Sequence, residues 1–233
     1  MAISKPEHTV LAQQWCKRVA NKQNIIREHF ALVEPVIALQ ASLLDALDCQ
    51  QLIPACLVDL ASCARKARRL PVAVAALEKL FGNDQTANNP AGLLEEARGL
   101  WAQGDDDKAV GLARYIIDEQ NSRRAGSPES VNTAVLSDAL RLAGKWMASN
   151  RSESSVVITR DCLGPAIQEA VSLNDHTRSL KAKYVMATYC ETQFRSLQQT
   201  DAVRQESIQT QEEEVQKWEG SKTDKENRTI LAT

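Results

Sequence analysis

The stretch Leu93–Ile117, LLEEARGLWAQGDDDKAVGLARYII, decides the fold of this chain. Its apolar residues recur every three to four positions, which is typical of one face of an α-helix. The positions that this spacing assigns to a core are Leu94, Ala97, Trp101, Leu112 and Ile116. Gly104 ends the first helix, and the aspartates after it put negative charge where the dipole of a second helix favours it. The short turn leaves only antiparallel packing, so the stretch predicts an αα-hairpin.

The same helical rhythm recurs before and after this hairpin. Ser127 and Pro128 supply an N-cap hydroxyl and a proline at the first helical position, and the helix that follows carries Trp146 on its apolar face. Further on, Tyr184 and Phe194 belong to an apolar stripe that keeps a 3.6-residue rhythm over about five turns. We therefore expect Trp146, Tyr184 and Phe194 to join the core.

Paired helices without a strict repeat consensus predict an all-α fold, an α-solenoid of divergent tetratricopeptide-like helical hairpins. We expect residues 1–22 to form a helical N-terminal flank and residues 23–199 to form the solenoid. The composition becomes strongly charged after that point, so residues 200–219 are expected to continue as a charged helix. Residues 220–233 show no pattern and are expected to be a disordered tail.

Composition excludes several classes of protein. The 233 residues carry a net charge of −2, so there is no general basic field for nucleic acid and no polybasic membrane signal. No apolar run approaches the length of a transmembrane helix. The start MAISKPEH lacks the apolar region of a secretory signal, so we expect free thiols in a reducing compartment.

Catalytic motifs are absent from the sequence. There is no phosphate-binding loop, no kinase H-R-D or D-F-G set and no G-x-S-x-G elbow, and the three histidines are scattered. Glu95, Glu96 and the run Asp105–Asp107 are interpreted as solvated helix faces and turn charges. We predict no catalytic residue and no cofactor site.

Two groups of residues, one of cysteines and one of basic side chains, are candidates for binding sites. Cys49, Cys56 and Cys63 are seven residues apart, but two helical turns span about 10.5 Å, too far for one zinc ion, so no metal site is predicted. The dense basic run is Arg65, Lys66, Arg68 and Arg69. A single such run without interleaved aromatics is more typical of a charged helix end than of a nucleic-acid interface.

Six segments in order resemble one family. They are EPVIALQASLLDAL (Glu34–Leu47), LVDLASCARKARRLPVAVAALEKL (Leu57–Leu80), the hairpin quoted above, RLAGKWMA (Arg141–Ala148), LGPAIQEAV (Leu163–Val171) and KAKYVMATYCETQFRSL (Lys181–Leu197). Their order and spacing resemble the FAT domain of ATM-like serine/threonine kinases, in the phosphatidylinositol-3-kinase-related family. The strongest likenesses are the E-E-A-x-x-x-W hairpin and the last helix, with Lys181, Lys183, Ala187, Thr192, Gln193 and Phe194 at the family's positions.

The resemblance implies a regulatory helical scaffold that wraps a kinase domain, in a nuclear protein of DNA double-strand-break signalling and telomere maintenance. Its partners would be the kinase domain and neighbouring helical repeats, with a homodimer in the intact protein, and neither membrane nor direct nucleic-acid binding. ATP and a divalent metal would be used by a kinase domain that this sequence lacks, so we expect a fragment, a truncated gene model or a splice product. The rival hypotheses are a free-standing tetratricopeptide-like adaptor for a protein partner and, last, a new small enzyme.

Overall fold

The computed structural model describes residues 10–16, 29–82 and 88–231. Residues 10–16 are helical, which is the described part of the flank expected at residues 1–22. The helices that follow are α2 (Phe30–Ala46), α3 (Ile53–Lys66), α4 (Leu70–Phe81), α5 (Pro90–Gln103), α6 (Asp106–Gly126), α7 (Thr133–Asn150), α8 (Ser155–Val157), α9 (Gly164–Ser172) and α10 (His176–Leu231). Short 3₁₀ turns, η1 (Gln50–Leu52) and η2 (Pro128–Ser130), and a π-helical turn, η3 (Ile158–Leu163), join some of them. The described residues contain no strand, and the chain is all-α.

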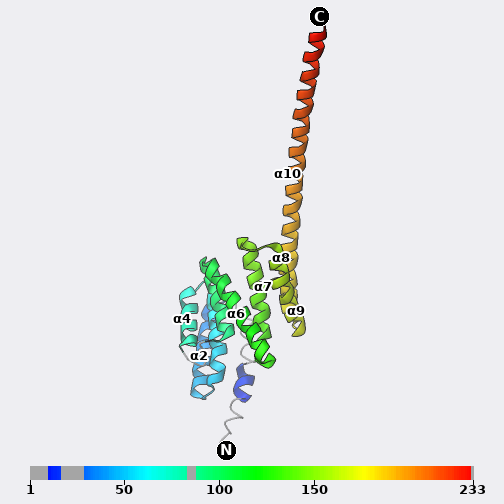
Figure 1. The fold of residues 1–233 in the computed structure, drawn as a ribbon. Helices are drawn as coiled ribbons and strands as arrows, with labels where there is room; N and C mark the ends of the chain where they lie inside the picture. Colours follow the sequence, from blue (N-terminus) through cyan, green and yellow to red (C-terminus); the bar gives the residue numbers. More distant parts are fainter. Residues whose placement is uncertain (1–9, 17–28, 83–87, 232–233) are drawn as a thin grey trace, which may run out of the picture. The chain divides into compact units, whose positions relative to one another are not determined.

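The chain divides into two compact units, Met1–Lys183 and Tyr184–Thr233. In the first unit the helices pack on near neighbours in the sequence: α2 on α3, α3 on α4, α4 on α5, α5 on α6, α6 on α7 and, past the short α8, α7 on α9 (Figure 1). The described part of the second unit, residues 184–231, belongs to α10.

The core of the first unit is divided into clusters along the row of helices. One cluster lies between α3 and α4 and includes Leu57 and Leu80, and another lies between α2 and α3 and includes Val33 and Ile37. A third joins α7, α9 and the start of α10, through Leu140 among others. A core that is distributed in this way, with each helix contacting near neighbours, is typical of a solenoid.

The hairpin predicted over Leu93–Ile117 is formed by α5 and α6. Asn89 caps α5, because its side-chain oxygen accepts hydrogen bonds from the backbone N–H groups of Ala91 and Gly92 at 3.0 and 3.1 Å. Gly104 ends α5 with φ of +87°, in the left-handed region that glycine enters without strain. Asp106 and Asp107 occupy the first turn of α6, as predicted, and Asp105 is the N-cap residue just before it.

Two expectations differ from the structure at helix ends. Ser127 and Pro128 do not open α7: Pro128 begins the turn η2, and α7 starts at Thr133 under a cap by Asn132, whose side chain accepts from the Val135 N–H at 3.1 Å. Residues 220–231, for which we expect disorder, lie within α10. The sequence contains no proline after position 165, so nothing in it removes a backbone donor from this helix.

In the part of the chain that the structure describes, no helix combines the length and the apolar character needed to cross a membrane.

Candidate functional site

The α5–α6 hairpin carries five of the residues that the sequence assigns to the core. Leu94, Ala97 and Ile116 are buried, whereas Trp101 and Leu112 are half-buried. The hairpin therefore shares its apolar stripe with neighbouring helices rather than enclosing it alone, as a solenoid unit does.

Trp146 of α7 is buried, with 3% of its surface exposed, and stacks on Trp101 of α5. The ring centroids are 5.1 Å apart and the ring planes are inclined by 13°. A stacked aromatic pair contributes about 0.5–1.5 kcal/mol beyond the area that it buries. Sequence spacing assigns both rings to the core, but it does not pair them, because they lie on helices separated by the whole of α6.

Tyr184 and Phe194 correct the sequence prediction. Tyr184 is 74% exposed and Phe194 is 61% exposed, so neither belongs to the core of this chain. The buried residues at the start of α10 are instead Ser179 and Ala182. The 3.6-residue rhythm identifies an apolar face of α10 correctly, but burial also requires an element that covers the face, and none does so among the described residues.

Glu95 is a second correction, since it is not a solvated residue of a helix face. Its side chain is 2% exposed, and it accepts from Arg65 Nε of α3 at 2.5 Å and from Arg98 Nη1, one turn further along α5, at 2.8 Å. A buried carboxylate is tolerated only with such partners, because its desolvation costs several kcal/mol. The i, i+3 pair of Glu95 with Arg98 is the one sequence signal that could have indicated this site.

Asp138 of α7 extends the ion pairs of Glu95, because it lies near Arg98. Its Oδ1 accepts from Arg141 Nη2 at 3.1 Å, and its Oδ2 accepts from Arg178 Nε of α10 at 3.3 Å. Arg98 Nη2 lies 3.8 Å from the same Oδ2. Arg178 also donates its backbone N–H to Asp175 Oδ1 at 2.9 Å. We call the connected residues the ion-pair chain: Arg65, Glu95, Arg98, Asp138, Arg141 and Arg178.

The ion-pair chain links α3, α5, α7 and the first turns of α10 within the first unit. It also changes the interpretation of the basic run in the sequence. Arg65 points into the fold and is 18% exposed at its side chain, while Lys66, Arg68 and Arg69 are exposed. Of the four cationic side chains in this run, that of Arg65 forms an ion pair inside the first unit.

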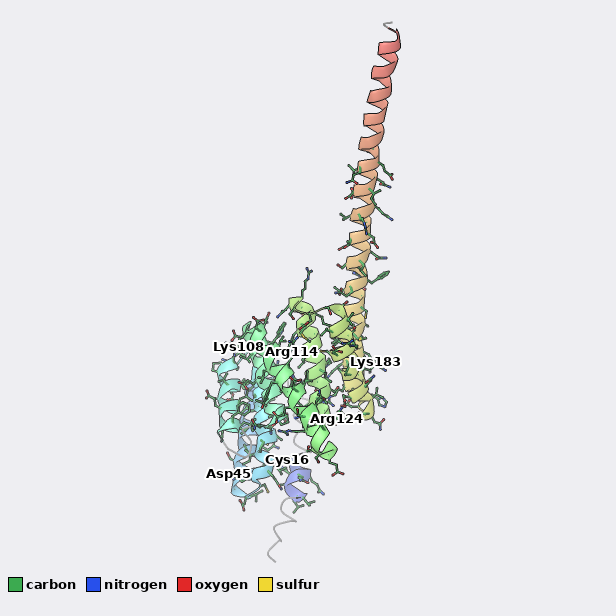
Figure 2. All side chains as sticks on the ribbon, in the orientation of Figure 1. Cys16, Asp45, Lys108, Arg114, Arg124 and Lys183 are labelled. Atoms are coloured by element: carbon green, nitrogen blue, oxygen red, sulfur yellow. The ribbon has the colours of Figure 1, made fainter. Side chains whose placement is uncertain are left out.

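Two further arginines, both labelled in Figure 2, fasten α6 to later elements. Arg124 donates to both carboxylate oxygens of Glu169 on α9, at 2.7 and 2.9 Å. Arg114 pairs with Glu153, in the connection after α7. The Arg124 pair has the bidentate geometry that gives an exposed ion pair directional specificity.

Buried neutral polar groups join the helices as well. The Ser137 hydroxyl of α7 donates to the carbonyl of Ala166 on α9 at 2.8 Å. The Gln120 side chain of α6, 1% exposed, accepts from the Asn132 N–H at 2.8 Å, just before α7. These bonds satisfy buried polar groups where neighbouring elements meet, and they fix the register of those elements.

Among the described residues, no group of three or more His, Cys, Asp or Glu side chains could hold a metal ion. None of the six cysteines, all of which lie among the described residues, forms a disulfide. Burial raises the pKa of Cys56 to about 11 and that of Cys162 to about 11, so both remain neutral thiols near pH 7. The contacts that the geometry offers are joints between the helices of the first unit.

Comparison with known proteins matches residues 4–220 to the FAT domain. The chain is also similar to the serine/threonine-protein kinase ATM of Arabidopsis thaliana, with 31% identity over 181 residues. That alignment covers 75% of this chain and 4% of the relative, so the chain spans only a small part of the relative's length. The matched range includes the α5–α6 hairpin and every residue of the ion-pair chain, and on this basis the chain belongs to the FAT-domain family, as a segment like that of an ATM-type kinase.

Proposed function

We propose that this chain is a regulatory and scaffolding segment of an ATM-like serine/threonine kinase and performs no chemistry of its own. The observation that carries the proposal is the match to the FAT domain over residues 4–220, together with the similarity to an ATM kinase. The joints between helices support it, because a scaffold needs fixed register between its helices more than it needs reactive groups.

The finer role follows from the family resemblance. The intact protein acts in the nucleus, in DNA double-strand-break signalling and telomere maintenance, and phosphorylates serine or threonine followed by glutamine. The partners of the segment are the kinase domain and neighbouring helical repeats of the same polypeptide, and the intact protein forms a homodimer. ATP and a divalent metal belong to the kinase domain, and the segment binds neither membrane nor nucleic acid.

A chimera tests the proposal. The aligned segment of the Arabidopsis ATM kinase is replaced by residues 4–220 of this chain, in cells that lack their own ATM. We expect phosphorylation of a Ser-Gln or Thr-Gln peptide that rises after DNA breaks, and a deletion of the segment serves as the negative control. A chimera that accumulates to normal levels yet has lost damage-dependent activity would contradict the proposal, as would phosphotransfer from ATP by the chain alone.

A further inference from the structure

The part of α10 after Lys183 carries a line of exposed residues at coiled-coil spacing. Positions that recur alternately every four and every three residues form one seam along a helix. Here they are Cys190, Phe194, Leu197, Asp201, Arg204 and Ile208, which we call the α10 seam, and all six are exposed. Between residues 190 and 208 the positions outside the seam are polar or charged, except Ala202 and Val203. The α10 seam therefore gathers most of the apolar surface of this stretch.

Two opposite charges interrupt the α10 seam at its centre. Asp201 and Arg204 hold consecutive seam positions, with Leu197 before them and Ile208 after them. Neither side chain forms an ion pair or a hydrogen bond with another residue that the structure describes. A charged group inside an apolar seam weakens pairing in general, but it fixes the partner, the register and the orientation when its opposite charge comes from the partner helix.

An antiparallel second copy of α10 matches both charges at once. When Asp201 lies opposite Arg204 of the second copy, two-fold symmetry places Arg204 opposite the second copy's Asp201. The same alignment sets Leu197 opposite Ile208 and Phe194 opposite Gln211 of the other copy. A parallel pair would instead set aspartate against aspartate and arginine against arginine, and such contacts between like charges are repulsive. Charge complementarity therefore selects the antiparallel arrangement.

We propose that α10 of this chain pairs with α10 of a second copy as a short antiparallel coiled coil, centred between residues 201 and 204. The proposed function gives the intact protein a homodimer without assigning its surface, and the pairing goes beyond it because it rests on α10 alone. A second copy is the occupant that fits, since one helix supplies both the apolar seam and the two complementary charges.

The residues beside the α10 seam permit the pairing but add little to it. The central flanking positions are uncharged: Gln198, Thr200, Gln205 and Ser207. Glu191 approaches Glu212 of the second copy, and Arg195, which pairs with Glu191 at 2.6 Å, offsets their repulsion.

The interface is small, and we therefore expect a weak dimer with a Kd of about 0.1 mM. At about 1 µM only about 2% of the chains would be paired, so α10 is uncovered in dilute solution.

Sedimentation equilibrium of the full chain, over about 1–500 µM, tests the pairing and should show a reversible monomer–dimer equilibrium. Asp201→Arg sets arginine against arginine at both ion pairs and should raise the Kd at least about tenfold. The double variant Asp201→Arg/Arg204→Asp restores opposite charges and should return the Kd to within about threefold of the wild type. Glu206→Arg makes the same change of charge outside the α10 seam and should leave the Kd unchanged.

Disulfide trapping in a Cys190→Ser background reports the orientation. Position 197 of one copy lies opposite position 208 of the other, whereas the two positions 197 are separated by about 16 Å along the helices. A disulfide spans at most about 7 Å between Cα atoms. A mixture of Leu197→Cys and Ile208→Cys chains should therefore form the mixed disulfide, and neither variant alone should link these positions between copies.

Three results would contradict the pairing. They are a monomer over the whole concentration range, a double variant that pairs as weakly as Asp201→Arg, and a disulfide between the two positions 197. Each of them leaves the scaffold role standing, because that role is tested separately by the kinase chimera.

Discussion

α7 and the part of α10 after Lys183 are both regular helices with apolar residues at helical spacing, yet they have opposite surroundings. α7 buries ten residues, including Trp146, and is packed by α6 on one side and α9 on the other. In the stretch 184–213, no side chain is buried. The comparison shows that sequence periodicity determines the conformation and the apolar face of a helix, whereas burial depends on whether a neighbour is present.

The sharpest contrast between these helices is in their aromatic residues. Trp146→Ala removes a buried ring and its stack on Trp101, and should cost about 3–5 kcal/mol of unfolding free energy. Phe194→Ala is the matched control and should change it by less than about 0.5 kcal/mol, because that ring is 61% exposed. Denaturant unfolding followed by circular dichroism measures both. Equal losses in the two variants would mean that the face of α10 is covered in solution.

A smaller effect is expected from glycines that differ in their surroundings. A Cβ at Gly144 of α7 would lie 2.7 Å from Leu163 Cδ2 and 3.1 Å from Cys162 Cβ, so Gly144→Ala should cost about 1–3 kcal/mol. A Cβ at Gly111 of α6 would meet nothing within 4 Å, and Gly111→Ala should instead stabilise the helix by up to about 1 kcal/mol. If thermal melts show Gly144→Ala to be as stable as the wild type, the close packing of α7 on η3 is wrong.

A local cap should matter less than packing, even in the well-packed unit. Asn89→Ala removes the acceptor for two N–H groups at the start of α5 and should cost about 1 kcal/mol. Asn121→Ala, at an exposed position of α6, provides the control. A loss for Asn89→Ala as large as that for Trp146→Ala would show that capping, and not contact between helices, dominates this unit.

The smallest expected effect is electrostatic and lies on the surface of α6. A hydrogen bond from Tyr115 and the ion pair with Arg123 lower the pKa of Glu119 below its ordinary value of 4.5. Because the folded-state pKa is lowered, the contribution to stability is present above pH 4.5 and is lost as the pH falls through the folded-state value. Tyr115→Phe should move the pKa of Glu119 back toward 4.5, as an NMR titration of the carboxyl group would show. An unchanged titration would exclude the hydrogen bond.

The sequence predicts the helices and the hairpin well, and it predicts contacts between distant helices poorly. Leu94 and Ala97 of α5 and Ile116 of α6 are buried at positions that the apolar spacing within each helix predicts, and local sequence reveals that spacing. The Trp101–Trp146 stack and the Asp138–Arg178 contact join helices far apart in the sequence, and no local pattern specifies such partners. The interpretation of Glu95 as a solvated residue is wrong for the same reason, since one of its two arginine partners, Arg65, comes from α3.

We infer that the described helices between residues 30 and 183 form a packed scaffold, whereas residues 184–213 of α10 bury no side chain. Hydrogen exchange of the unmodified full chain tests this most directly, because exchange reports local opening along each helix. We predict that amides of α7, residues 133–150, exchange at least about 100-fold more slowly than those of residues 186–213. Equal protection of the two helices would contradict the claim, since it would require a neighbour that covers α10.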